Sequence, residues 1–140
     1  MFYISNPIRY NFFMKDYLAK IIFLIHSVII ISWIGLFFVP TRLWADRIIF
    51  HFYLTLVIVA NQFLWGFLIM PWTKKYRMVC FLTTVHQLLR GKSISDEENY
   101  KHSFSKEFLG DIGITISHRF ATIFTFTIST IITIQYFFFR

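Results

Sequence analysis

The sequence predicts an all-α integral membrane protein with three transmembrane helices and one short amphipathic helix. Hydrophobic residues make up 56% of the 140 residues and charged residues only 15%, far from the composition of a soluble domain. Three segments are apolar and long enough to cross a bilayer. Lys and Arg are concentrated in alternate connecting segments, as in membrane proteins of fixed orientation. The length leaves room for a single membrane domain over residues 1–140.

The first span is expected at residues 21–40, IIFLIHSVIIISWIGLFFVP, which carry no formal charge. At about 1.5 Å per residue, a helix of this length crosses a hydrocarbon core of about 30 Å. Before it, aromatic residues on both sides of Pro7 predict an interfacial N-terminal segment over residues 1–20.

The second span is expected at residues 48–70, ending before Pro71 and the interfacial aromatic Trp72. The third is expected at residues 120–139, although its β-branched, partly alternating stretch TIFTFTISTIITI is typical of a strand. One isolated strand in lipid would leave its backbone groups unpaired on both edges, whereas a helix pairs them internally. We therefore predict a helix.

A short amphipathic helix is expected at residues 76–90, ended by Gly91. Its apolar residues recur at helical spacing on one face, and Thr83, Thr84, His86 and Gln87 lie on the other. We expect this helix to lie at the cytoplasmic interface or to dock on the bundle by its apolar face. A shallow re-entrant position, with the helix buried all round, is the alternative. Residues 92–113 are expected to form a polar cytoplasmic loop with one turn around Phe104 and Phe108.

Eleven of the fourteen Lys and Arg residues lie in the N-terminal flank or in residues 72–119. With three spans, both of these segments lie on one side of the membrane, and the positive-inside rule places that side in the cytoplasm. This consistency supports an odd number of spans. The expected location is the cell inner (cytoplasmic) membrane, or the mitochondrial inner membrane if the source is organellar. Expected partners are the lipid bilayer and other membrane protein subunits. The basic charge lacks a recognition motif, so no nucleic acid partner is expected.

His26, His51 and the segment CFLTTVH, residues 80–86, carry a family resemblance. The chain resembles, over about residues 20–135, a widespread and uncharacterised family of small bacterial integral membrane proteins. That family typically shows Cys-Pro-Leu-Thr followed by an acidic residue three positions later. Here Phe81 stands at the proline position and His86 at the acidic position. The resemblance implies a helical bundle and supplies no activity.

His26 and His118 are candidate cofactor-binding residues, because both are expected near the cytoplasmic leaflet. Two imidazoles from separate helices are what a membrane b-type haem needs as axial ligands. The simpler interpretation gives His26 a hydrogen bond to another helix and His118 a headgroup contact. No cofactor is required by that interpretation.

A polar stripe is expected inside the second span, where His51, Thr55, Gln62 and Trp65 share one face with Asn61 alongside. Polar groups at bilayer depth turn towards other helices, so this stripe should face the bundle. No intramembrane carboxylate accompanies it, which favours helix packing over a transport path.

The sequence favours a structural or accessory subunit of a membrane assembly. An electron carrier that binds haem or quinone through His26 and His118 is the alternative, and a small transporter is a further one. Neither a catalytic residue nor a metal ligand set is predicted, because Cys80 is the single thiol and no triad or carboxylate pair is present. An enzyme is therefore not expected.

Overall fold

The computed structural model describes residues 7–100, 104–111, 113–115 and 117–139. Among these, the side chains of 7–12, 98–99, 105–107, 111 and 118 are not described. The protein is all-helical, and three helices are long and apolar enough to span a membrane. Shorter helices complete the fold, so the predicted fold class is confirmed.

The first spanning helix, α1, runs from Pro7 to Gly35 and is extended by the short helix η1, Leu36–Phe38. Residues 7–20 are helical and continuous with the span, and their interfacial position stays a prediction. Proline is well suited to the first helical position, because its fixed φ angle is already helical. The apolar stretch of this helix covers Phe13–Phe38.

The second spanning helix, α2, covers Arg47–Thr73 and carries Pro71 inside its last turn. We expected the span to end at residue 70. The helix closes at Lys74 instead, which has a φ of 56° and donates its backbone N–H to the Met70 carbonyl at 2.9 Å. This left-handed cap lies three residues beyond the proline.

The third spanning helix, α5, covers His118–Phe139, which confirms a helix for the β-branched segment. Thr125, Thr130 and Thr133 donate their hydroxyls to the carbonyls four residues earlier, at 2.8–3.0 Å. Such bonds let a threonine-rich segment stay helical in lipid without polar partners elsewhere.

Between α2 and α5 lie three short helices: α3, Phe81–Leu89; η2, Glu97–Tyr100; and α4, Phe104–Asp111. The predicted polar loop at 92–113 therefore contains two helical segments. Gly91, with a φ of 78°, follows α3, and the N–H of Lys92 reaches back to the Gln87 carbonyl at 3.0 Å. This is the left-handed glycine termination that the sequence predicts.

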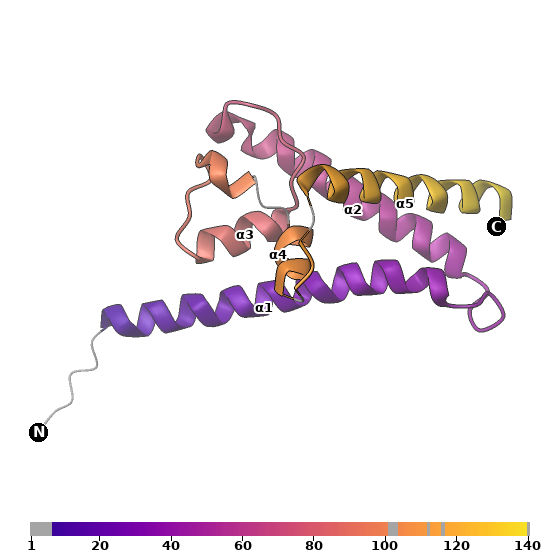
Figure 1. Ribbon diagram of the computed structural model, residues 1–140, viewed down its shortest axis with the longest axis horizontal. Helices are drawn as coiled ribbons and strands as arrows, with labels where there is room; N and C mark the ends of the chain where they lie inside the picture. Colours follow the sequence, from indigo (N-terminus) through magenta and orange to yellow (C-terminus); the bar gives the residue numbers. More distant parts are fainter. Residues whose placement is uncertain (1–6, 101–103, 112, 116, 140) are drawn as a thin grey trace, which may run out of the picture.

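α1 and α2 meet at the loop 39–46 and separate towards the other end of the molecule, and α5 crosses α2 (Figure 1). We call these ends the hairpin end, with residues 39–46, and the basic end, with Lys74 and Arg119. α1 makes its most extensive contacts with α3, and α2 with α5. The short helices α3 and α4 lie at the basic end, in the space that opens between α1 and the other two spans (Figure 1).

The apolar core lies towards the hairpin end and joins the three spans. It consists of Trp33 from α1 and of Ile128 and Ile132 from α5, with Phe52 and Ile58 of α2 packed against them. Lipid chains are as apolar as these side chains, so their packing stabilises the fold through close contact and not through transfer from water.

Candidate functional site

The polar side chains of α3 point into the protein. Thr83, Thr84, His86 and Gln87 are all less than 8% exposed, whereas Phe81 and Leu88 are 40% and 44% exposed. We call these four residues the inner polar face of α3. This orientation is opposite to the one we expected from the sequence. An apolar outer face is the one that lipid solvates well, and on the inner face Thr84 accepts the indole N–H of Trp65.

His26 of α1 lies against this region at the basic end. Its ring stacks on Phe104 of α4 with a centroid separation of 3.7 Å, and it is close enough to His86 for the two imidazoles to interact electrostatically. Phe23, one turn earlier, contacts both Phe104 and His86 at centroid separations of 5.1 and 5.7 Å. The Nδ1 atom of His26 is buried and has no hydrogen-bond partner among the described residues.

The chain turns back along α2 after Thr73. Tyr76 contacts Phe63 and Phe67, and the carbonyl oxygen of Arg77 lies so close to Gly66 that an added Cβ would stand 2.3 Å from it. Only glycine permits this close approach of two backbones.

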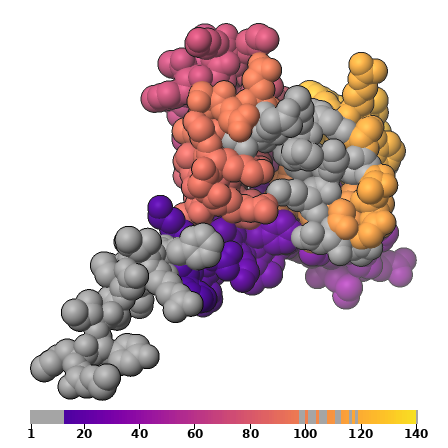
Figure 2. All heavy atoms as spheres, turned by 60° about the vertical axis from the view of Figure 1, so that its left-hand side comes forward, coloured from indigo at the N-terminus to yellow at the C-terminus, as the bar shows by residue number. Residues whose placement is uncertain are grey.

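The returning segment brings α3 deep along α2. Asn61 accepts the backbone N–H of Phe81 at 3.3 Å and the thiol of Cys80 at 3.7 Å, while the indole of Trp65 donates to Thr84 at 2.9 Å. Asn61 lies twelve residues before Thr73, about 18 Å along the helix. The start of α3 therefore lies well inside the length of α2, and the re-entrant position of α3 stays a prediction. In Figure 2, which brings the basic end forward, α3 and its following loop lie between the end of α2 and α1.

Cys80 caps the N-terminal end of α3. Burial raises the pKa of its thiol, and the backbone N–H groups of Leu82 and Thr83 only partly offset this. The thiol therefore stays protonated at neutral pH, which makes it a weak nucleophile and a weak metal ligand. Among the described residues, no three His, Cys, Asp or Glu side chains are grouped so that they could hold a metal ion.

A second polar cluster lies at the hairpin end. Trp33 donates its indole N–H to the Thr55 hydroxyl at 2.8 Å, and that hydroxyl donates to the His51 carbonyl at 2.8 Å. His51 is 1% exposed and packs edge-on against Phe37. Neither of its ring nitrogens makes a well-formed hydrogen bond to a described residue, although the backbone of Trp33 lies close by.

Arg47 closes the hairpin itself. Its guanidinium donates to the carbonyls of Leu36 and Phe37 at 2.9 and 3.0 Å. These carbonyls belong to the last turn of the first span, where helical partners run out and a positive charge is favourable.

The structure thus divides the predicted polar stripe of α2. His51 and Thr55 face the core, Asn61 and Trp65 face α3, and Gln62 is half-buried without a hydrogen bond to another described residue. The side chain of His118 lies outside the described residues, so its pairing with His26 stays a prediction.

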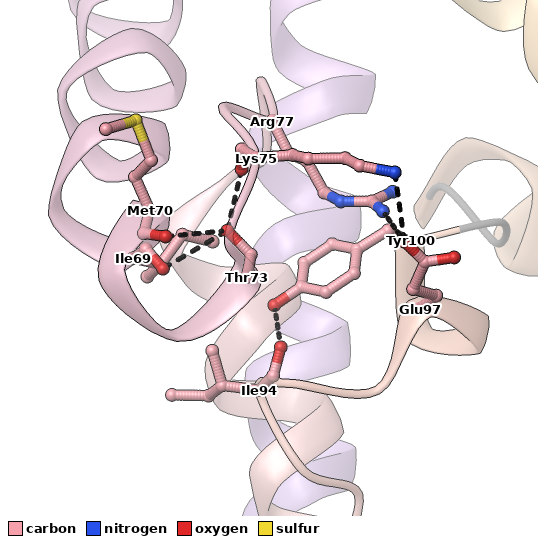
Figure 3. A network of polar contacts seen from close by, with 8 residues as sticks. All are labelled: Ile69, Met70, Thr73, Lys75, Arg77, Ile94, Glu97 and Tyr100. Carbon is pink, nitrogen blue, oxygen red and sulfur yellow. Dashed lines mark hydrogen bonds and ion pairs between the residues drawn. The ribbon is translucent and has the colours of Figure 1, made fainter.

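A third polar network ties the loop after α3 to the end of α2 (Figure 3). Glu97 pairs with Arg77 at 2.9 Å and with Lys75 at 3.7 Å. The Arg77 guanidinium lies 5.0 Å from the ring centroid of Tyr100, whose hydroxyl donates to the Ile94 carbonyl. Glu97 is more than half exposed, so its ion pairs are screened and contribute mainly to the position of the loop.

A lateral groove of about 510 Å³ lies between α2 and α5. Its walls are mostly apolar, and its hydroxyl-bearing residues are Thr55, Ser129, Thr130 and Thr133. Three of these hydroxyls bond carbonyls of their own helices, whereas the buried Oγ of Ser129 has no partner among the described residues.

No protein-family model, curated protein or solved structure matches this chain. The resemblance to the uncharacterised family of small bacterial membrane proteins therefore stays a prediction.

Proposed function

We propose that this chain is a non-catalytic multi-pass protein of the cell inner membrane that acts as a structural or accessory subunit of a larger membrane assembly. The supporting observation is how little of its spans is buried inside the chain. Only 22%, 17% and 17% of the residues in the apolar stretches of α1, α2 and α5 are buried. Transmembrane helices associate through close packing and hydrogen bonds, so the remaining faces are available to lipid and to helices of partner subunits.

The groove between α2 and α5 is the surface that we assign to a partner helix. It is concave and contains small side chains, such as Ala60 and Ser129, that let a helix backbone approach closely.

Site-specific photo-crosslinking in native membranes tests this assignment. A benzophenone amino acid at Val59 points into the groove, and the same group at Val57, which is 63% exposed and does not line the groove, is the matched control. We expect Val59 to give an adduct of discrete mass with one membrane protein, identified by mass spectrometry. Val57 should give lipid adducts.

A groove-filling substitution completes the test. Ala60→Leu should abolish the Val59 adduct while the protein remains inserted, because the larger side chain occupies the space of the partner helix. Lipid adducts alone at both positions would contradict the accessory role.

An electron carrier is the second candidate function, and one observation favours it. The Nδ1 atom of His26 is buried without a partner among the described residues, so the imidazole has a coordination position that the described fold does not use. The visible absorbance spectrum of the purified protein separates the two functions. A Soret band that is lost in His26→Leu would support haem binding, and a spectrum without visible bands would favour the accessory role.

A further inference from the structure

Gln87 is a buried amide whose polar atoms are not satisfied by the fold. The residue is 4% exposed, and neither Oε1 nor Nε2 has a hydrogen-bond partner among the described residues. A primary amide carries two donors and an acceptor, and leaving all of them unpaired in a protein interior is strongly unfavourable. Gln87 therefore needs a hydrogen-bond partner beyond the described residues.

A small cavity lies beside this side chain. Its volume is about 10 Å³, and Thr83, Thr84 and Gln87 of α3 contribute to its lining together with Ser93, Ile94 and Tyr100 of the following loop. About 10–15 Å³ of such space is what one water molecule requires. The cavity is thus large enough for water and too small for a metabolite.

The two threonine hydroxyls that line the cavity differ in their hydrogen bonds. The Thr84 hydroxyl already makes two hydrogen bonds, since it accepts the indole N–H of Trp65 and donates to the Cys80 carbonyl. Thr83 is 6% exposed and makes no side-chain hydrogen bond to another described residue. Gln87 and Thr83 together supply the two or more polar contacts that hold a buried water in place.

The loop of residues 92–100 forms one wall of the cavity. Tyr100 and Ile94 line it and bond each other, and Tyr100 lies against Arg77, which is itself paired with Glu97 (Figure 3). The ion pair between Arg77 and Glu97 therefore holds the loop over the cavity.

We propose that this cavity is a binding site for one water molecule, held by the carboxamide of Gln87 and the hydroxyl of Thr83 on the inner polar face of α3. The water enters from the basic end, under the loop that Arg77 and Glu97 hold in place. It hydrates α3 at a depth where lipid surrounds the outer face of the same helix, and so allows a glutamine to be buried there.

Silver-ion accessibility tests the site, because Ag⁺ enters water-sized spaces that bulky thiol reagents do not reach. In a Cys80→Ser background, the thiol of Gln87→Cys should react with Ag⁺. Because the blocked thiol no longer reacts with maleimide, the protein should then give little maleimide labelling once it is denatured. It should resist the bulky, charged methanethiosulfonate reagent MTSET. Ile69→Cys, at a position 1% exposed, is the dry control and should resist both. If Gln87→Cys is as inert to Ag⁺ as Ile69→Cys, or reacts with MTSET as well, the proposal is overturned.

Two further measurements address the loop and the unaltered protein. Glu97→Gln should accelerate the reaction of Gln87→Cys with Ag⁺, and an unchanged rate would overturn the role of the ion pair in closing the cavity. In the protein with its native Gln87, nuclear magnetic resonance should show cross-relaxation between water and the Gln87 side-chain amide. Its absence would overturn the site, whether or not the cysteine variant folds.

Discussion

The indole N–H of Trp33 donates to the hydroxyl of Thr55 at 2.8 Å, and this bond joins α1 to α2 next to the apolar core. Both residues are buried, and the Thr55 hydroxyl in turn donates a hydrogen bond to the His51 carbonyl. The bond therefore links two spanning helices through one side-chain pair that lipid cannot replace.

Thr55→Val should weaken the association of α1 with α2, because it leaves the buried indole N–H without an acceptor. Hydrogen bonds between membrane helices measure about 0.6 kcal/mol on average and about 1.7 kcal/mol at most. We expect a coupling energy in this range from a double-mutant cycle of Thr55→Val with Trp33→Phe, measured by reversible unfolding in bicelles. Thr130→Val, which removes a hydroxyl bonded within its own helix, is the control and should show no coupling to Trp33→Phe.

Arg47→Leu should destabilise the hairpin end. The substitution leaves the carbonyls of Leu36 and Phe37 without their charged donor, and such hydrogen bonds contribute about 1.5–3 kcal/mol. Arg42→Leu is the matched control, because Arg42 is exposed in the same loop, and it should change stability by less than about 0.5 kcal/mol. Equal unfolding free energies for the two variants would contradict the capping role.

The outer face of α3 should lie in lipid. A polarity-sensitive fluorophore on Leu88→Cys, in a Cys80→Ser background, should emit at short wavelength and be quenched by spin-labelled lipids. The same fluorophore on Ser95→Cys, in the exposed loop, should be quenched by aqueous iodide. Iodide quenching at both positions would place α3 at the membrane surface and contradict the re-entrant arrangement.

The contrast between α5 and α3 shows which parts of the fold the sequence could predict. The spans follow from apolar length, and the helix at α5 follows from the need to pair every backbone group in lipid. For α3, the periodicity identified the two faces correctly. Which of the two faces points into the protein depends on whether the helix is surrounded by water or by lipid. We applied the rule that polar groups turn inward to His51 and Thr55, and the same rule applied to Thr84 and Gln87 would have found the inner polar face.

Other parts of the site required the three-dimensional structure. His86 comes to lie against Phe23 of α1 only because the chain returns along α2. The close approach of Arg77 to Gly66 has no periodic signature in the sequence. In the sequence, Arg47 was only one of the three Lys and Arg residues outside the two basic segments. Its capping of Leu36 depends on the geometry of the loop between the two helices.

The contribution of Tyr100 to stability should fall at high pH. Burial raises the pKa of its phenol, and the nearby Arg77 lowers it by a smaller amount. A group with a raised folded-state pKa stabilises the fold fully below its unfolded pKa, about 10 for tyrosine, and this stabilisation is lost as the pH rises through the raised value. The stability difference between the wild type and Tyr100→Phe should therefore shrink above this pH.

Arg77→Gln provides the control for this pH dependence. It removes the cation that opposes the shift, so the phenolate absorbance of Tyr100 should appear at still higher pH than in the wild type. Ionisation of Tyr100 at lower pH than free tyrosine would contradict the effect of burial.

The last prediction concerns orientation. The loop 39–46 and the loop after α3 lie at opposite ends of the molecule (Figure 1). An impermeant maleimide should therefore label cysteines at Ala45 and Ser95, one in each loop, from opposite sides of the membrane. Eleven of the fourteen Lys and Arg residues lie in the segments of the basic end, and moving them across the membrane during insertion is unfavourable. We therefore expect Ser95→Cys and Ser5→Cys to react only from the cytoplasmic side of oriented vesicles, and Ala45→Cys only from the other side. Labelling of Ala45→Cys and Ser95→Cys from the same side would contradict three spans. Opposite labelling with Ala45→Cys on the cytoplasmic side would keep the spans and reverse the orientation, which would mean that a signal other than these basic residues directs insertion.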